Sequence, residues 1–188
     1  MPKKIVVYLG SSEGNSPKFK RNAEELGGKL VKANFEIIYG GASVGTMRAL
    51  ADGALDAGGY VTGVFPKNFK GKKEVAAKGV EVRYNKLSKI IETDGLSDRI
   101  AKMEEMSDAC VILPGSYGTM NELFIYLLNR QLAYHEKQIY VLNTDGYYNP
   151  LRDLISNMAD NGFISRADGN LLVFCNEVDD IVSLLKNS

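Results

Sequence analysis

The sequence alternates between short apolar runs and longer amphipathic segments along nearly its whole length. Each short run has four to six residues and is rich in β-branched or aromatic side chains, which is typical of buried strands. Strands that are apolar on both faces and separated by helices favour a parallel sheet covered on both sides. The predicted strands are residues 5–9, 36–39, 60–65, 89–92, 109–113, 138–142 and 171–174.

The intervening segments carry helix signals. Pro17 lies near the start of the first, and Gly58-Gly59 follows the second. No repeat, low-complexity segment or linker divides the chain, so we expect one α/β domain over residues 1–188 with a mostly parallel sheet of about seven strands in three layers. The predicted helices are residues 17–31, 44–57, 96–106, 119–134, 149–161 and 177–186.

Composition excludes several kinds of partner. The 188 residues include 23 basic and 23 acidic side chains, so no net charge draws the chain toward nucleic acid or a membrane surface. No apolar run approaches the ~18 residues of a membrane span, and no signal-peptide pattern precedes the first strand. We expect a cytoplasmic protein, with Cys110 and Cys175 as buried, reduced thiols.

Glycine-rich turns follow three of the predicted strands. The first strand ends in Gly10-Ser11-Ser12, the second in residues 40–46, which begin Gly40-Gly41, and the fifth in residues 114–119. In parallel α/β sheets, ligands bind beyond the carboxyl ends of the strands. We therefore predict that these turns form one rim, where a ligand approaches backbone amides closely.

The third of these turns is the most informative. Pro114, Gly115, Ser116, Tyr117 and Gly118 lead into a helix that Thr119 is predicted to open. Backbone N–H groups at such a turn, together with the helix dipole, form a site for a phosphate. Glu122 is expected in the first helical turn, where its charge would repel that phosphate. Chemistry on the molecule that carries the phosphate is one good reason for this carboxylate.

Other kinds of site lack their signatures. No G-x-G-x-x-G follows the first strand, and no Gly-Lys-Ser/Thr closes a Walker loop. His135, the single histidine, is interpreted as a cap at a helix end, and no His/Cys cluster has metal-ligand spacing. No lysine lies in a strand-end motif suited to a Schiff base, which argues against pyridoxal chemistry and lysine decarboxylation. We predict neither a catalytic metal nor a cofactor.

The motifs, their order and their spacing resemble the LONELY GUY family over nearly the whole chain. Residues 114–122, PGSYGTMNE, are similar to its PGGxGTxxE motif, and residues 7–12 and 39–47 are similar to its CGSS strand and YGGGxxGLM turn. Asp98-Arg99, Met103 and Ser107-Asp108-Ala109 resemble its ERKxxM and SDA segment. Three further segments follow in the family's order: Gln131-Leu132, residues 142–148 and Gly162-Phe163-Ile164.

The resemblance implies a Rossmann-like sandwich, usually a homodimer, that hydrolyses the N-glycosidic bond of a nucleoside 5′-monophosphate. The family's enzymes act on cytokinin riboside 5′-monophosphates and often carry a lysine decarboxylase label. The resemblance also implies catalytic roles for Arg99 and Glu122 and a substrate contact for Glu81. The phosphate is expected at residues 115–119, Ser11, Gly40 and Gly41.

The chain departs from the family pattern at several positions. Ser116 stands where the motif has its second glycine, and a left-handed backbone there would cost on the order of 1 kcal/mol. Asn121 replaces an acidic residue, and Ile100 replaces a lysine that often follows the arginine. These changes leave open a different class of function: a non-catalytic carrier or sensor for a nucleotide or for the molybdenum cofactor, whose carrier proteins share this fold. Such a protein would bind without turnover.

Overall fold

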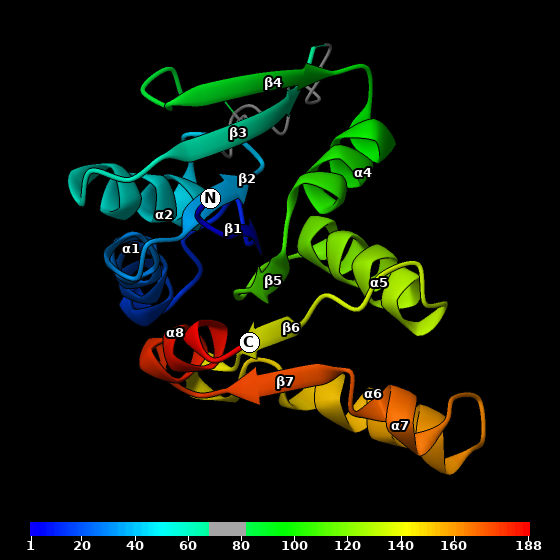
Figure 1. Ribbon diagram of the computed structural model, residues 1–188. Helices are drawn as coiled ribbons and strands as arrows, with labels where there is room; N and C mark the ends of the chain where they lie inside the picture. Colours follow the sequence, from blue (N-terminus) through cyan, green and yellow to red (C-terminus); the bar gives the residue numbers. More distant parts are fainter. Residues whose placement is uncertain (68–81) are drawn as a thin grey trace.

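The computed structural model describes residues 1–67 and 82–188, which form a seven-stranded sheet with helices on both faces (Figure 1). Every neighbouring pair of strands is parallel, so the predicted α/β class and strand number are confirmed. The strands are β1 (Lys4–Tyr8), β2 (Glu36–Tyr39), β3 (Val61–Pro66), β4 (Lys89–Thr93), β5 (Ala109–Ile112), β6 (Ile139–Leu142) and β7 (Leu172–Cys175).

The strand order explains where a ligand can bind. The sheet runs β4-β3-β2-β1-β5-β6-β7, so the chain builds outward from β1 on one side and then returns to build outward on the other. Tyr8, the last residue of β1, lies opposite Ile112, the last residue of β5. The order therefore reverses between β1 and β5, which is the point where open α/β sheets have their crevice.

Helices cover both faces of the sheet, and each face has its own core. On one face the core includes Leu26, Leu50 and Ile181 from three helices, and on the other it includes Met103, Leu123 and Leu151. The first set of helices is α1 (Pro17–Lys32), α2 (Gly45–Asp56) and α8 (Val178–Lys186), and the second is α4 (Leu96–Met106), α5 (Tyr117–Gln131) and α6 (Asn149–Asp160). Two short elements, the 3-10 turn η1 (Thr144–Gly146) and α7 (Arg166–Gly169), were not predicted.

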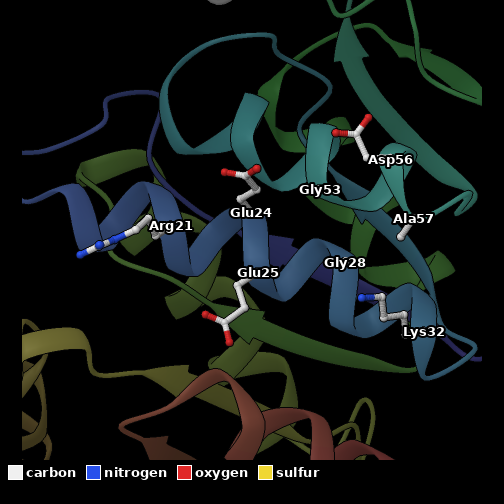
Figure 2. A pocket seen from close by; sticks show the side chains of 8 residues that line it. All are labelled: Arg21, Glu24, Glu25, Gly28, Lys32, Gly53, Asp56 and Ala57. Carbon is white, nitrogen blue, oxygen red and sulfur yellow. The ribbon is translucent and has the colours of Figure 1, made fainter.

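Helices α1 and α2 touch through their backbones (Figure 2). A Cβ on Gly27 would overlap the Leu50 carbonyl oxygen, and one on Gly53 would overlap the Glu24 carbonyl oxygen. Only glycine allows this approach. A groove of about 440 Å³ beside the crossing carries charges of both signs, among them Arg21, Glu24, Glu25, Lys32 and Asp56.

The two cysteines are buried and form no disulfide, as predicted. Burial raises the pKa of the Cys110 thiol well above its usual range, and it raises the pKa of Cys175 to about 11. Both side chains therefore act as small apolar residues of the core. Within the described ranges, no helix has both the length and the apolar character needed to cross a bilayer.

Candidate functional site

The three glycine-rich turns meet at the carboxyl edge of the sheet. The Gly10 N–H donates to the Pro114 carbonyl oxygen at 3.2 Å, which joins the turns after β1 and β5. The Thr46 hydroxyl at the start of α2 donates to the Gly10 carbonyl oxygen at 2.7 Å, which joins the turn after β2 to the same point. Two hydrogen bonds thus connect three turns that are more than 30 residues apart in the sequence.

The turn after β5 leads directly into α5. Ser116 takes the N-cap position in an extended conformation, with φ of −102°, so replacing the motif's glycine causes no left-handed strain. A Cβ on Gly115 would overlap the Thr119 hydroxyl, so that position admits only glycine. The first amides of a helix have no partner within it, and no side chain caps them here. Ser116, Tyr117 and Gly118 are exposed, so this end of α5 is accessible from solvent, as anion binding at a helix N-terminus requires.

Glu122 lies one turn deeper than predicted. Because the extended Ser116 lets α5 begin at Tyr117, Glu122 falls in the second helical turn, and the first turn contains no acidic residue. The prediction failed because it took Thr119 as the helix start, whereas Thr119 is buried inside the helix. The added turn separates the Glu122 carboxylate from the terminal amides, which lessens its repulsion of an anion bound there.

Arg99 is buried in α4 against the turn after β2. The side chain is 5% exposed, and its guanidinium occupies the space where Gly40 lacks a side chain. A Cβ on Gly40 would overlap Arg99 Nη2 and would lie 2.6 Å from Met47 Cε. Gly40 thus gives Arg99 its place at the carboxyl edge, where a permanent positive charge suits an anionic ligand.

The other predicted positions are distributed around this edge. Ser11 is exposed in the turn after β1. Gly41, with φ of +78°, packs against Gly63 of β3, and its carbonyl oxygen accepts a hydrogen bond from the Tyr84 N–H. Through these contacts, Gly41 holds the turn after β2 against β3. Glu81 lies outside the described residues.

Two aromatic residues that the sequence did not single out line a pocket beside the rim. Tyr147, in the segment after β6, donates its hydroxyl to the Gly115 carbonyl oxygen at 2.6 Å. Its ring meets Phe19 of α1 edge-on, with centroids 5.7 Å apart. The pocket has a volume of about 160 Å³, and Ser11 and Ser116 also line it. The sequence signal was the Gly146-Tyr147-Tyr148 segment, which periodicity alone does not connect to the turn after β5.

A polar network lies at the opposite end of α4 and α5. The Glu104 carboxylate accepts two hydrogen bonds from Asn129 Nδ2, both at 2.9 Å, and lies 2.8 Å from His135 Nε2. The Lys137 N–H donates to His135 Nδ1 at 3.3 Å, so the neutral Nε2–H tautomer fits both contacts. Burial lowers the pKa of His135, against a raising effect from Glu104. His135 therefore joins α5 to α4 and does not cap α5, which corrects its predicted role.

The described residues form no cluster of metal-binding side chains. In residues 1–67 and 82–188, no cluster of three or more His, Cys, Asp or Glu side chains is placed to hold a metal ion. Among the described residues, the rim offers backbone amides, hydroxyls, the buried Arg99 guanidinium and the Glu122 carboxylate. The amides and the guanidinium can bind the phosphate of a ligand. The carboxylate can stabilise positive charge that develops on a reacting atom of the same ligand.

Several known proteins are similar in sequence to this chain. A family model described as "Possible lysine decarboxylase" matches residues 47–185. A cytokinin riboside 5′-monophosphate phosphoribohydrolase of Rhodococcoides fascians is 33% identical over 99% of this chain and 90% of its own. One from Arabidopsis thaliana is 34% identical over 98% of this chain and 83% of its own.

A solved structure shares the fold. The molybdenum cofactor binding protein of Rippkaea orientalis superposes with a TM-score of 0.71 over 100% of this chain and 97% of its own, at 21% identity. At that identity the likeness shows the fold alone. The family model covers most of the chain, and the phosphoribohydrolases match it over almost its full length. The chain therefore belongs to the LONELY GUY family, whose model bears the description "Possible lysine decarboxylase".

Proposed function

We propose that the protein hydrolyses the N-glycosidic bond of a purine nucleoside 5′-monophosphate, with or without a substituent on N6, to give the free base and ribose 5-phosphate. The observation that carries the proposal is the joint position of the α5 N-terminus, Arg99 and Glu122 at one edge of the sheet. Relatives named as phosphoribohydrolases match this chain over almost its whole length, which supports the same reaction here.

The first amides of α5 hold the 5′-phosphate in this proposal. Three or more backbone N–H groups point from the helix end toward the ligand, and the helix dipole adds to their effect. Ser116 stands where the family motif has a glycine, and its hydroxyl supplies a further hydrogen-bond donor to the phosphate. Arg99 adds the positive charge that a phosphate or a developing anion requires.

In this proposal, Glu122 acts at C1′ of the ribose, on the opposite side of the sugar from the 5′-phosphate. As the C1′–N9 bond breaks, positive charge develops on the ribose, and a nearby carboxylate stabilises it. The carboxylate also orients the water whose oxygen forms the new bond to C1′, and it accepts a proton from that water. The bonding electrons leave with the base, which is protonated on release. The ribose lies between the phosphate and Glu122, which keeps the two negative charges apart.

A substrate panel tests this function. Nucleoside 5′-monophosphates with plain and N6-substituted purines are compared with the corresponding nucleosides, and free base is measured by chromatography. We expect release from the monophosphates and a loss of at least about 100-fold in kcat/KM without the phosphate, because the binding energy of the phosphate orients the reacting sugar. Tight binding of the monophosphates without release of base would instead favour a carrier or sensor.

We also propose that the protein forms a homodimer through α5. The outer side of this helix exposes Phe124, Leu128 and Leu132 at 37%, 50% and 56%. Beside them, an apolar pocket of about 250 Å³ lies between α5 and the segment that begins at Ile155. Exposed apolar surface of this kind is typical of an interface. Sedimentation at low concentration that shows only a species near the chain mass of 20.6 kDa would contradict the dimer.

The cellular location is a further proposal. The two cysteines are reduced and buried in the core, an arrangement that suits a reducing compartment. We therefore place the enzyme in the cytoplasm, and fractionation of cells that express a tagged chain tests that location.

A further inference from the structure

Tyr8 carries a buried hydroxyl that the packing of the core does not explain. It is the last residue of β1, it is 1% exposed, and its hydroxyl has no hydrogen-bond partner in the part of the chain that the structure describes. Its ring meets Tyr126 of α5 edge-on, with centroids 6.3 Å apart. Burial of an unsatisfied hydroxyl lowers stability, because the group loses its bonds to water and gains none.

Other tyrosines of the protein do not share this property. Among the described residues, these tyrosines have a hydroxyl within hydrogen-bond distance of a partner: Tyr39, Tyr84, Tyr126, Tyr147 and Tyr148. Phenylalanine at position 8 would fill the same space without the cost of a buried unsatisfied hydroxyl. A buried polar group without a partner calls for an explanation, and one explanation is a partner that the group contacts only when the site is occupied.

The direction of α5 places Glu122 near the Tyr8–Tyr126 pair. Glu122 and Tyr126 are four residues apart, so they lie on the same side of the helix. Because α5 starts at the carboxyl edge, Glu122 is nearer to that edge than Tyr126, whose ring contacts Tyr8. Glu122 therefore lies between the Tyr8–Tyr126 pair and the ligand site.

The electrostatic surroundings keep Tyr8 protonated. Burial is the main cause that raises the pKa of Tyr8 well above its usual range. The acidic groups that face it add to this effect: Cys110 of β5, Glu122 and Tyr126 of α5, and Glu104 of α4. Tyr8 thus keeps its O–H donor at neutral pH, within electrostatic reach of Glu122.

We propose that Tyr8 is a positioning residue for Glu122: in the substrate-bound enzyme its hydroxyl donates a hydrogen bond to the Glu122 carboxylate and holds it toward C1′ of the ribose. This inference rests on the proposed hydrolysis. Hydrogen bonds to a charged acceptor are stronger than neutral ones and fix its orientation. A carboxylate held in this way remains ionised and needs no reorientation when positive charge appears on the sugar.

The test compares Tyr8→Phe with Tyr126→Phe. Tyr126 is the matched control, because it is buried in the same aromatic pair but its hydroxyl already pairs with Ser107 at 3.1 Å. For Tyr8→Phe we expect a melting temperature equal to or above wild type. We expect kcat for base release to fall roughly 10- to 100-fold with little change in KM. For Tyr126→Phe we expect the reverse: a lower melting temperature and a normal kcat.

The pH profile separates positioning from a structural role. Loss of a donor to a carboxylate makes its charged form less favourable. The acid limb of kcat for Tyr8→Phe should therefore move to higher pH, and that of Tyr126→Phe should not. A normal kcat in Tyr8→Phe, or a fall in kcat matched by a fall in melting temperature, overturns the role of Tyr8 and leaves the hydrolase function standing. Failure of the wild-type protein to release base from every monophosphate overturns both.

Discussion

The two ends of the α4–α5 helix pair differ in how their polar groups are satisfied. At the end near the amino edge of the sheet, Glu104 is held by Asn129 and His135 in contacts of 2.8–2.9 Å. At the end near the carboxyl edge, the first amides of α5 have no side-chain cap, and the Tyr8 hydroxyl is buried without a partner among the described residues. The polar groups at the first end are paired within the protein, whereas the second end leaves the α5 amides and the Tyr8 hydroxyl without partners among the described residues.

This difference separates a structural region from a functional one within a single helix pair. Buried polar groups are normally paired, and a functional role is one explanation for an unpaired group. Substitutions in the network at the amino edge should therefore change stability, and substitutions at the carboxyl edge should change activity. Four predictions test that division, in order of decreasing effect.

Glu122→Gln should give the largest effect and leave the fold intact. The amide keeps the size of the side chain but can neither carry the negative charge nor accept the proton, so we expect kcat to fall roughly 100- to 10,000-fold. The melting temperature should change little, because Glu122 is only partly buried. Free base is measured after incubation with the preferred monophosphate, and near-normal release would refute the catalytic role.

Glu104→Ala should lower stability and leave activity unchanged. It leaves Asn129 Nδ2 and His135 Nε2 without their acceptor, so we expect a loss of about 2–4 kcal/mol in the free energy of unfolding. Urea denaturation measures this loss, and kcat per folded molecule should remain normal. Glu105→Ala is the matched control, because this exposed neighbour contacts only Lys102 in the described structure and should alter neither quantity. A large drop in kcat for Glu104→Ala at normal stability would show that the network at the amino edge also has a role in activity.

Gly40→Ala tests the packing under Arg99. The added Cβ would overlap the guanidinium, and relief of this overlap must displace Arg99 from the site. A displacement of about 1 Å can cost roughly 100-fold in rate, so we expect a fall of 10- to 100-fold in kcat/KM. Gly169→Ala in α7 is a suitable comparison, because a Cβ there would make only ordinary contacts, the nearest of them 3.8 Å from Ala159 Cβ. Equal activities of the two variants would show that the position of Arg99 is unimportant.

The smallest effect concerns pH and His135. Burial lowers the pKa of His135 in the folded state below its unfolded value of about 6.5. The unfolded chain therefore binds a proton first as the pH falls, and stability present above pH ~6.5 is lost as the pH falls below it. His135→Gln retains a donor toward Glu104 but does not titrate. The stability difference between wild type and this variant should shrink between pH 7 and pH 5, as measured by urea denaturation.

The fold was accessible from the sequence because it depends on local patterns. Seven apolar runs with helices between them specify a parallel sheet, and strand ends were predicted within one or two residues. Errors occurred where turn chemistry decides the boundary. The extended Ser116 starts α5 at Tyr117, and the short helix α7 owes its existence to the capping box of Ser165 and Asp168.

The site was accessible only in part, because some of its contacts are not local. The glycine turns, Arg99 and Glu122 carry recognisable motifs. The contact between Tyr147 and Gly115 joins residues 32 positions apart, and that between His135 and Glu104 joins residues 31 apart. Neither leaves a periodic signal. Tyr8 fits the pattern of a buried strand whether or not its hydroxyl has a role, so only its lack of a partner in the folded chain draws attention to it.

The hydrogen bonds between the three turns have a consequence for the thermodynamics of binding. Gly10 is held on one side by Pro114 and on the other by Thr46, so the backbone of the rim is already ordered before a ligand arrives. A preorganised rim loses little conformational entropy on binding, and more of the interaction energy remains as affinity. Thr46→Val, which removes one of these bonds, should therefore show itself as a more unfavourable binding entropy in calorimetry.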